Sequence, residues 1–142
     1  MPWLPKKNVI VPVDFSDQSF AALDAALEMV EGASDLHAIH VLPELSAAEP
    51  GIVWEAIDDT SRRKHAEEAL RERLADARYS GVNVEISFGD PGHVITDFAQ
   101  KAGAELIVMP SHGRTGIKRL LIGSVAERVM RLAHCPVLVL RD

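Results

Sequence analysis

Short apolar runs alternate with amphipathic stretches along this chain, and the two patterns predict different elements. Apolar runs that predict strands occur at 8–13, 36–42, 82–88, 105–109 and 136–140. The run 8–13 is rich in β-branched residues and almost wholly apolar, which is typical of a central parallel strand covered on both faces. The run 82–88 alternates apolar and polar residues, so we place it at an edge of the sheet.

The intervening stretches carry apolar residues at spacings of three and four, as expected for helices with one core-facing side. Ser16 is the predicted N-cap of the first helix and Gly32 its stop. Asp90 followed by Pro91 marks another helix start. The residues expected to face the core are Phe20, Leu23, Leu27 and Val30 in the first helix, Ala66, Leu70, Leu74 and Ala77 in a long helix over 55–79, Val94, Ile95, Phe98 and Ala102 in a helix that stops at Gly103, and Val125, Val129 and Leu132 in the last helix.

The regular alternation of strands and helices predicts an α/β fold. We expect a doubly wound, five-stranded parallel sheet of strand order 3-2-1-4-5 with helices on both faces, in one domain over residues 1–142. In such sheets ligands lie beyond the carboxyl ends of the strands, where the strand order reverses. Asp14 ends the first strand and a glycine-bearing loop follows the fourth, so both should border the same crevice.

Composition narrows the class of protein. The chain is 47% hydrophobic and 25% charged, as in ordinary globular domains, and its net charge of -6 argues against a general nucleic-acid binder. We find no apolar run long enough to cross a bilayer and no signal-peptide pattern at the start, so a cytoplasmic location is expected. Cys135 is the only cysteine, which fits a reducing compartment and a packing role.

The stretch 109–127 carries the strongest chemical signal. Gly113, Gly116 and Gly123 allow close approach of the backbone to a ligand, and a helix start at Ser124 offers free N–H groups. With the cations Arg114, Lys118 and Arg119, these are the requirements of a phosphate site. The alternative is that Ser124 and Glu127 form only a capping box and that the cations face water.

Standard enzyme motifs do not occur. The first strand is followed by Asp14-Phe15-Ser16 rather than G-x-G-x-x-G, and no P-loop sequence is present. His112 has no evident partner as a general base, and His37 and His40 fall on opposite faces of a strand, so no protein-made metal site is expected. Without a nucleophile–base pair, an efficient enzyme is not expected.

Three motifs together resemble the universal stress protein family. They are the opening 9–16, the segment Ser111-His112-Gly113 followed after 114–122 by Gly123-Ser124-Val125, and the closing 135–139. The resemblance covers essentially the whole chain and implies one universal stress protein (adenine nucleotide alpha hydrolase-like) domain. The family's ATP-binding members have G-x-x-G, nine residues, then G-[ST]; here Pro110 stands at the first glycine position.

The resemblance implies a site for ATP, with a magnesium ion as an optional companion. Asp14 would accept hydrogen bonds from the ribose or adenine end, and Val41 would contact adenine through its backbone. Gly113, Gly123, Ser124 and the N–H groups of Val125 and Ala126 would hold the phosphates. The full set of expected nucleotide-binding residues is Pro12, Val13, Asp14, Ser16, Val41, Ser111, His112, Gly113, Arg114, Gly116, Gly123, Ser124, Val125 and Ala126.

Three functions remain open on these grounds. The first is a stress-response or signalling module whose bound ATP tunes conformation or partner choice. The second is a stress interaction protein that binds no nucleotide, with Pro110 as the mark of lost binding. The third is an ATPase or phosphotransferase, and without a nucleophile–base pair the chain is at most a slow ATPase. The apolar last strand, Val137–Leu140, predicts a homodimer, since family members commonly pair through this strand. The long loop 44–54 could act as a flap over the site.

Overall fold

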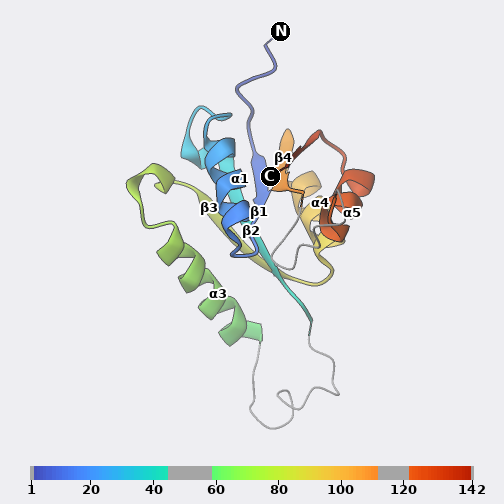
Figure 1. The fold of residues 1–142 in the computed structure, drawn as a ribbon. Helices are drawn as coiled ribbons and strands as arrows, with labels where there is room; N and C mark the ends of the chain where they lie inside the picture. Colours follow the sequence, from blue (N-terminus) through green and yellow to red (C-terminus); the bar gives the residue numbers. More distant parts are fainter. Residues whose placement is uncertain (1, 45–58, 112–121, 142) are drawn as a thin grey trace.

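A computed structural model describes residues 2–44, 59–111 and 122–141 of the chain (Figure 1). Within these residues five parallel strands form one sheet of order β3-β2-β1-β4-β5, so the predicted strand order is confirmed. The strands are β1 (Val9–Pro12), β2 (Leu36–Leu42), β3 (Asn83–Phe88), β4 (Leu106–Pro110) and β5 (Val137–Leu140).

Helices cover both faces of this sheet, as expected for a doubly wound fold (Figure 1). On one face α1 (Asp17–Leu27) and α3 (Asp59–Arg73) pack against strand residues such as Val9 and Val108. On the other face α4 (Pro91–Ala102) and α5 (Ser124–Leu132) pack against Ile10 and Ile107. Consecutive strand residues point to opposite faces, which explains why the central strands needed continuous apolar runs.

The first helix ends earlier than the sequence predicted. It stops at Leu27 with Glu28 as C-cap, not at Gly32. The Met29 carbonyl, one position later, accepts a hydrogen bond of 2.8 Å from the Lys6 N–H, so the N-terminal segment takes an acceptor that a longer helix would have used. Val30 therefore lies outside the helix, although it still packs against the core.

The predicted helix over 55–79 is also too long. Residues 55–58 lie outside the described part, α3 ends at Arg73, and Ala77–Tyr79 form a separate 3₁₀ helix. Its cap is Asp76, whose carboxylate accepts from the Arg78 N–H at 2.9 Å, because a short acidic side chain competes well for nearby backbone donors. Leu70 is fully buried as predicted, but Ala77 is exposed.

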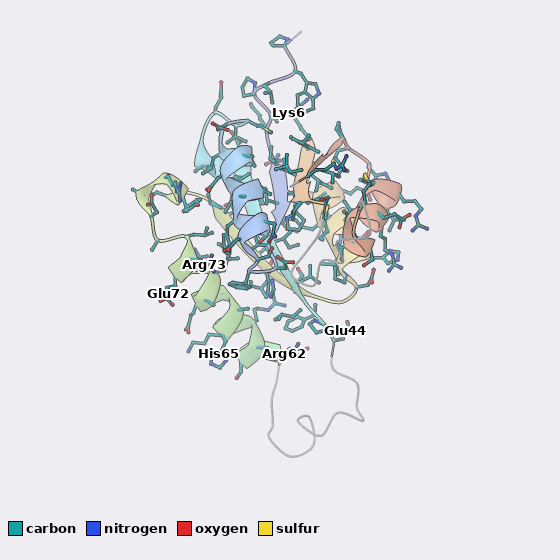
Figure 2. All side chains as sticks on the ribbon, in the orientation of Figure 1. Lys6, Glu44, Arg62, His65, Glu72 and Arg73 are labelled. Atoms are coloured by element: carbon teal, nitrogen blue, oxygen red, sulfur yellow. The ribbon has the colours of Figure 1, made fainter. Side chains whose placement is uncertain are left out.

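Arginines attach the first turn of α3 to the ends of two strands. The Arg62 guanidinium donates to the Pro43 carbonyl at 2.7 Å and lies 5.1 Å from the Phe88 ring centroid. Arg63 donates to the Ile86 carbonyl and stacks on the same ring at 5.2 Å. Figure 2 shows Arg62 and Glu44 at the same end of the molecule, opposite Lys6. The helix is therefore held by cations as well as by its narrow apolar side.

The predicted start and stop of α4 are confirmed. Asp90 is the N-cap and accepts from the His93 N–H at 3.2 Å, and Gly103 ends the helix in the left-handed conformation at φ 67°. The buried positions are Gly92, Ile95, Thr96 and Ala99, while Val94, Phe98 and Ala102 are half-buried beside them. The apolar side of the helix is therefore rotated slightly from the predicted line.

No helix in the described ranges is long and apolar enough to cross a membrane.

Candidate functional site

The carboxyl end of β1 turns sharply into α1. The Asp14 carboxylate accepts from the Ser16 N–H at 3.0 Å and from the Ser16 hydroxyl at 2.5 Å. The Ser16 hydroxyl oxygen in turn accepts from the Ser19 N–H at 3.1 Å, so Ser16 is the N-cap of α1 as predicted. Phe15 between them has φ 66°, a conformation that few residues other than glycine adopt. Asp14 is thus placed by this turn and does not itself cap the helix.

The neighbouring strand β2 is tied to this turn. The Val13 N–H donates to the Ile39 carbonyl at 2.8 Å, and the His40 ring nitrogen Nδ1 lies 2.6 Å from the Val13 carbonyl oxygen. Val41 follows at a half-buried position, and the Leu42 carbonyl accepts from the Gly89 N–H at 2.9 Å. The backbone around Val41 is therefore held from both adjacent strands.

On the other side of β1, the end of β4 is joined to the start of α5. The Ser111 N–H donates to the Leu140 carbonyl at 2.8 Å, and the Ser111 carbonyl accepts from the Gly123 N–H at 2.5 Å. Ser111 is almost fully buried. These contacts place the N-terminus of α5 next to the carboxyl end of β4, although the residues are separated by 112–122 in sequence.

The predicted start of α5 at Ser124 is confirmed. Gly123 is the N-cap, with no side-chain cap hydrogen bond, and Ser124 is the first helical residue. The alternative, in which Ser124 and Glu127 form only a capping box, is therefore wrong: Ser124 is not the cap, and the Glu127 N–H donates to the Gly123 carbonyl at 3.0 Å. Because glycine has no side chain, the N–H groups of the first turn receive no oxygen from the cap residue.

The inward face of α5 also requires correction. Ala126 and Val129 are buried, Leu132 is half-buried, and Val125 is exposed rather than inward. The buried side of the helix runs along Ala126, Val129 and Ala133, which all pack in one cluster. Val125 lies outside this cluster and is exposed to solvent in the first turn of the helix.

The structure brings the predicted residues together in part. Pro12 ends β1, and Val13 and Asp14 follow it directly. Val41 is near the end of β2, and Ser111 with Gly123 joins β4 to α5. Parallel strands end at the same edge, and β1 lies between β2 and β4, so these residues share the edge where the strand order reverses. Several predicted residues lie outside the described part of the chain, namely His112, Gly113, Arg114, Gly116 and the cations Lys118 and Arg119. The flap predicted for 44–54 also lies outside it, except for Glu44.

Sequence reasoning missed the contribution of His40 and Phe15. Their rings meet edge to face at 4.9 Å and 78°, against the turn that holds Asp14. The available signal was a histidine directly before Val41, near the end of a central strand, where an apolar residue would be the ordinary choice.

Titratable groups elsewhere fit structural roles. Burial raises the pKa of the half-buried Cys135 thiol, which disfavours the reactive thiolate and agrees with a packing role. The His93 backbone N–H, and then the Arg128 guanidinium 2.9 Å away, lower the pKa of Asp90. No group of three or more potential metal ligands occurs among the residues that the structure describes.

Comparison with known proteins gives a consistent result. The model of the "Universal stress protein family" matches residues 6–141. The universal stress protein MJ0531 of Methanocaldococcus jannaschii is 38% identical over 95% of this chain and 82% of its own. The universal stress protein YxiE of Bacillus subtilis is 35% identical over 94% of this chain and 98% of its own. The solved structure of MJ0577, also from M. jannaschii, is 28% identical and superposes with a TM-score of 0.77 over 98% of both chains.

Proposed function

The chain belongs to the universal stress protein family, and from this premise we propose that it is an ATP-binding stress-response or signalling module. Bound ATP would change its conformation or its choice of partner. The single observation that carries the proposal is the convergence of Asp14 and the first turn of α5 at the edge where the strand order reverses.

The first turn of α5 fits the phosphate end of ATP. A helix N-terminus offers backbone N–H donors and the positive end of the helix dipole. At α5 the cap residue Gly123 contributes no competing side-chain acceptor, and exposed Ser124 adds a hydroxyl group. Ser124, Val125 and Ala126 are then the proposed phosphate-binding residues, with His112, Gly113, Arg114 and Gly116 as further candidates.

The ends of β1 and β2 fit the other end of the nucleotide. The Asp14 carboxylate can accept hydrogen bonds from ribose hydroxyl groups, and the backbone at Val41 can pair with the edge of adenine. Both positions are built by hydrogen bonds between β1, β2 and β3. Binding would therefore require little rearrangement of this side. A magnesium ion would arrive with the phosphates of ATP.

Pro110 favours the alternative function, a stress interaction protein without nucleotide. It is the last residue of β4 and pairs with Leu140 in register. The Ser111 N–H points to β5, and successive residues of a strand direct their N–H groups to opposite sides, so the nitrogen of Pro110 faces the β1 side. A residue other than proline would present an N–H donor there.

Titration calorimetry with ATP separates the two functions. We expect heat of binding from the wild-type protein at millimolar nucleotide and tighter binding by Pro110→Gly, which restores the donor. Gly123→Val should weaken binding by about tenfold or more, because its side chain would lie at the phosphate-binding turn. Gly32→Val is the matched control, since Gly32 is also an N-cap glycine with extended backbone and open surroundings.

The outcomes are distinct. Binding by wild type that is lost in Gly123→Val and kept in Gly32→Val supports the proposal. If neither wild type nor Pro110→Gly produces heat or a thermal shift with ATP, the nucleotide-binding function is wrong and the interaction-protein function takes its place. Phosphate release no faster than a buffer blank would exclude an ATPase.

A further inference from the structure

His40 contacts the residues on both sides of Asp14. Its Nδ1 lies 2.6 Å from the carbonyl oxygen of Val13, which precedes Asp14, and its ring meets the ring of Phe15, which follows Asp14, at 4.9 Å. Because a carbonyl oxygen only accepts, Nδ1 carries the proton in this contact. One side chain from β2 thus holds the backbone before Asp14 and the ring after it.

The turn at Asp14 needs such support. Phe15 has φ 66°, and the left-handed conformation is unfavourable for a residue other than glycine, because its Cβ atom approaches the backbone too closely. Such conformations persist where the surroundings hold them. Phe15 also packs on Phe20 of α1, with ring centroids 6.2 Å apart, so its ring lies between His40 and the first helix.

The orientation of the Asp14 carboxylate follows from that turn. Its Oδ1 accepts from both the N–H and the hydroxyl of Ser16, and these donors are in place only when Phe15 bends the chain back. If the chain around Phe15 relaxed, both hydrogen bonds would be disturbed.

We propose that His40 is a positioning residue, which holds the Asp14 carboxylate in the orientation that receives the nucleotide. The inference rests on the proposed function for its ligand and on the contacts of His40 for its mechanism. His40 acts through Asp14 and needs no contact with ATP.

His37 provides the matched control. It lies on the same strand and is half-buried, with its Nε2 3.4 Å from the Asn8 Oδ1 and its ring 5.9 Å from that of Phe98. It is at the amino end of β2, away from Asp14. His37→Phe therefore makes a similar chemical change on the same strand without touching the turn.

Two His40 variants separate the two contacts. His40→Asn keeps an N–H donor close to the position of Nδ1 and removes most of the ring, whereas His40→Phe keeps the ring and removes the donor. The first readout is amide hydrogen exchange in nucleotide-free protein, followed at the Ser16 N–H. We expect exchange there to be about tenfold faster in His40→Phe, nearer to wild type in His40→Asn and unchanged in His37→Phe.

The second readout is a double-mutant cycle for ATP affinity. His40→Phe should lower affinity by about tenfold, while in an Asp14→Ala background the same change should have no further effect. A merely structural role would instead give additive losses. Thermal unfolding of each variant verifies that it is folded. If His40→Phe is not folded, His40→Asn takes its place in the cycle and tests the ring contact with Phe15 alone.

The possible failures are distinguishable. Wild-type protein that does not bind ATP would refute the proposed function, and the exchange readout alone would then decide whether His40 holds the turn. Wild-type protein that binds ATP, together with unchanged exchange at Ser16 in His40→Phe or additive losses in the cycle, would overturn the inference and leave the proposed function standing.

Discussion

At the scale of single residues, the edge where the strand order reverses depends on a few side chains that hold backbone groups. Ser16 holds the first turn of α1 and the Asp14 carboxylate together, and His40 holds the Val13 carbonyl. The sequence identified Ser16 because capping residues have a recognisable position before an apolar stripe. It could not identify His40, because its contacts join two strands that are distant in sequence.

Gly92 illustrates close packing between α4 and α5. A Cβ atom at Gly92 would lie 2.4 Å from the Arg128 Cδ and 2.6 Å from its Cγ. We expect Gly92→Ala to destabilise the fold by about 1–3 kcal/mol, as other overpacked sites do. In an Arg128→Ala background the cost should fall, since the two nearest atoms, Cδ and Cγ, are gone and only the Arg128 Cβ at 3.0 Å remains. Denaturant unfolding measures both values.

The control for this pair is Gly32→Ala, where the nearest atom to the added Cβ is the Ser34 hydroxyl oxygen at 4.0 Å. It should change stability by less than about 0.5 kcal/mol. An equal cost of Gly92→Ala with and without the Arg128 side chain would contradict the steric explanation.

Tyr79 gives a pH dependence on the alkaline side. Burial, and then its hydrogen bond to Asp24 at 2.5 Å, raise the pKa of Tyr79 to about 12 from 10.0. The folded state therefore holds the phenolic proton more tightly than the unfolded state. This contribution to stability is fully present below pH 10.0 and is lost as the pH rises through about 12.

Because Tyr79 is the only tyrosine, the tyrosinate absorbance band follows its titration without overlap. We expect a midpoint near pH 12 in folded protein and a lower midpoint in Asp24→Asn, which removes the charge and weakens the acceptor. Tyr79→Phe should lack this part of the alkaline loss of stability. A wild-type midpoint at pH 10.0 would show that the phenol is not held in this way.

At the scale of elements, the two helix starts nearest the strand-order reversal are capped differently. α1 begins with the side-chain cap of Ser16, whereas α5 begins at Gly123 with no side-chain cap hydrogen bond. The spacing of Ser124 and Glu127 left a capping box open as an alternative, but the cap is Gly123, whose N–H bonds to the Ser111 carbonyl. The spacing of neighbouring residues alone could not decide between these two caps, because the contact of Gly123 with Ser111 joins residues that are apart in sequence.

This difference predicts unequal effects of two serine substitutions. Ser16→Ala should cost about 1–2 kcal/mol of stability, because it removes the α1 cap and a hydrogen bond to Asp14. Ser124→Ala should cost less than about 0.5 kcal/mol, because Ser124 is not the cap. Chemical denaturation of both variants measures the effect, and equal losses would mean that Ser124 caps α5 after all.

At the scale of the whole molecule, β5 lies at one edge of the sheet and pairs with β4. The carbonyls of Pro136 and Leu140 accept from the N–H groups of Ile107 and Ser111. Alternate residues of a strand direct their backbone groups to opposite sides, so those of Val137 and Val139 face away from β4. The edge can therefore pair with a second copy of the chain, as we propose for a homodimer.

The dimer predicts a hydrodynamic mass of twice the 15.5 kDa of one chain. Val139→Pro removes one outward N–H donor and leaves the pairing with β4 in place, so it should shift the protein towards the monomer. Val139→Thr, which keeps the N–H and the branched shape, is the control. Analytical ultracentrifugation gives the masses, and a wild-type monomer, or a dimer unaffected by Val139→Pro, would contradict pairing through this edge.

The sequence by itself determined the fold class and the type of every described strand and long helix. Continuous apolar runs distinguished central strands such as 8–13 from the alternating edge strand 82–88. A strand buried on both faces needs apolar residues at every position, whereas a strand buried on one face needs them only at alternate positions. Asp90, Pro91 and Gly103 marked the ends of α4 correctly, since their effects are local. The family motifs selected Asp14, Ser111 and Gly123 as site candidates.

The tertiary structure alone decided the contacts that build the candidate site. The early end of α1, the position of the α5 cap and the support of Asp14 by His40 each depend on hydrogen bonds between segments far apart in the chain. Local conformational preferences are worth about 1 kcal/mol or less per residue. A hydrogen bond that satisfies a buried backbone group contributes at least as much, so it can decide where a helix begins or ends. Residue order therefore predicted which groups gather at the edge, and packing decided how they are held there.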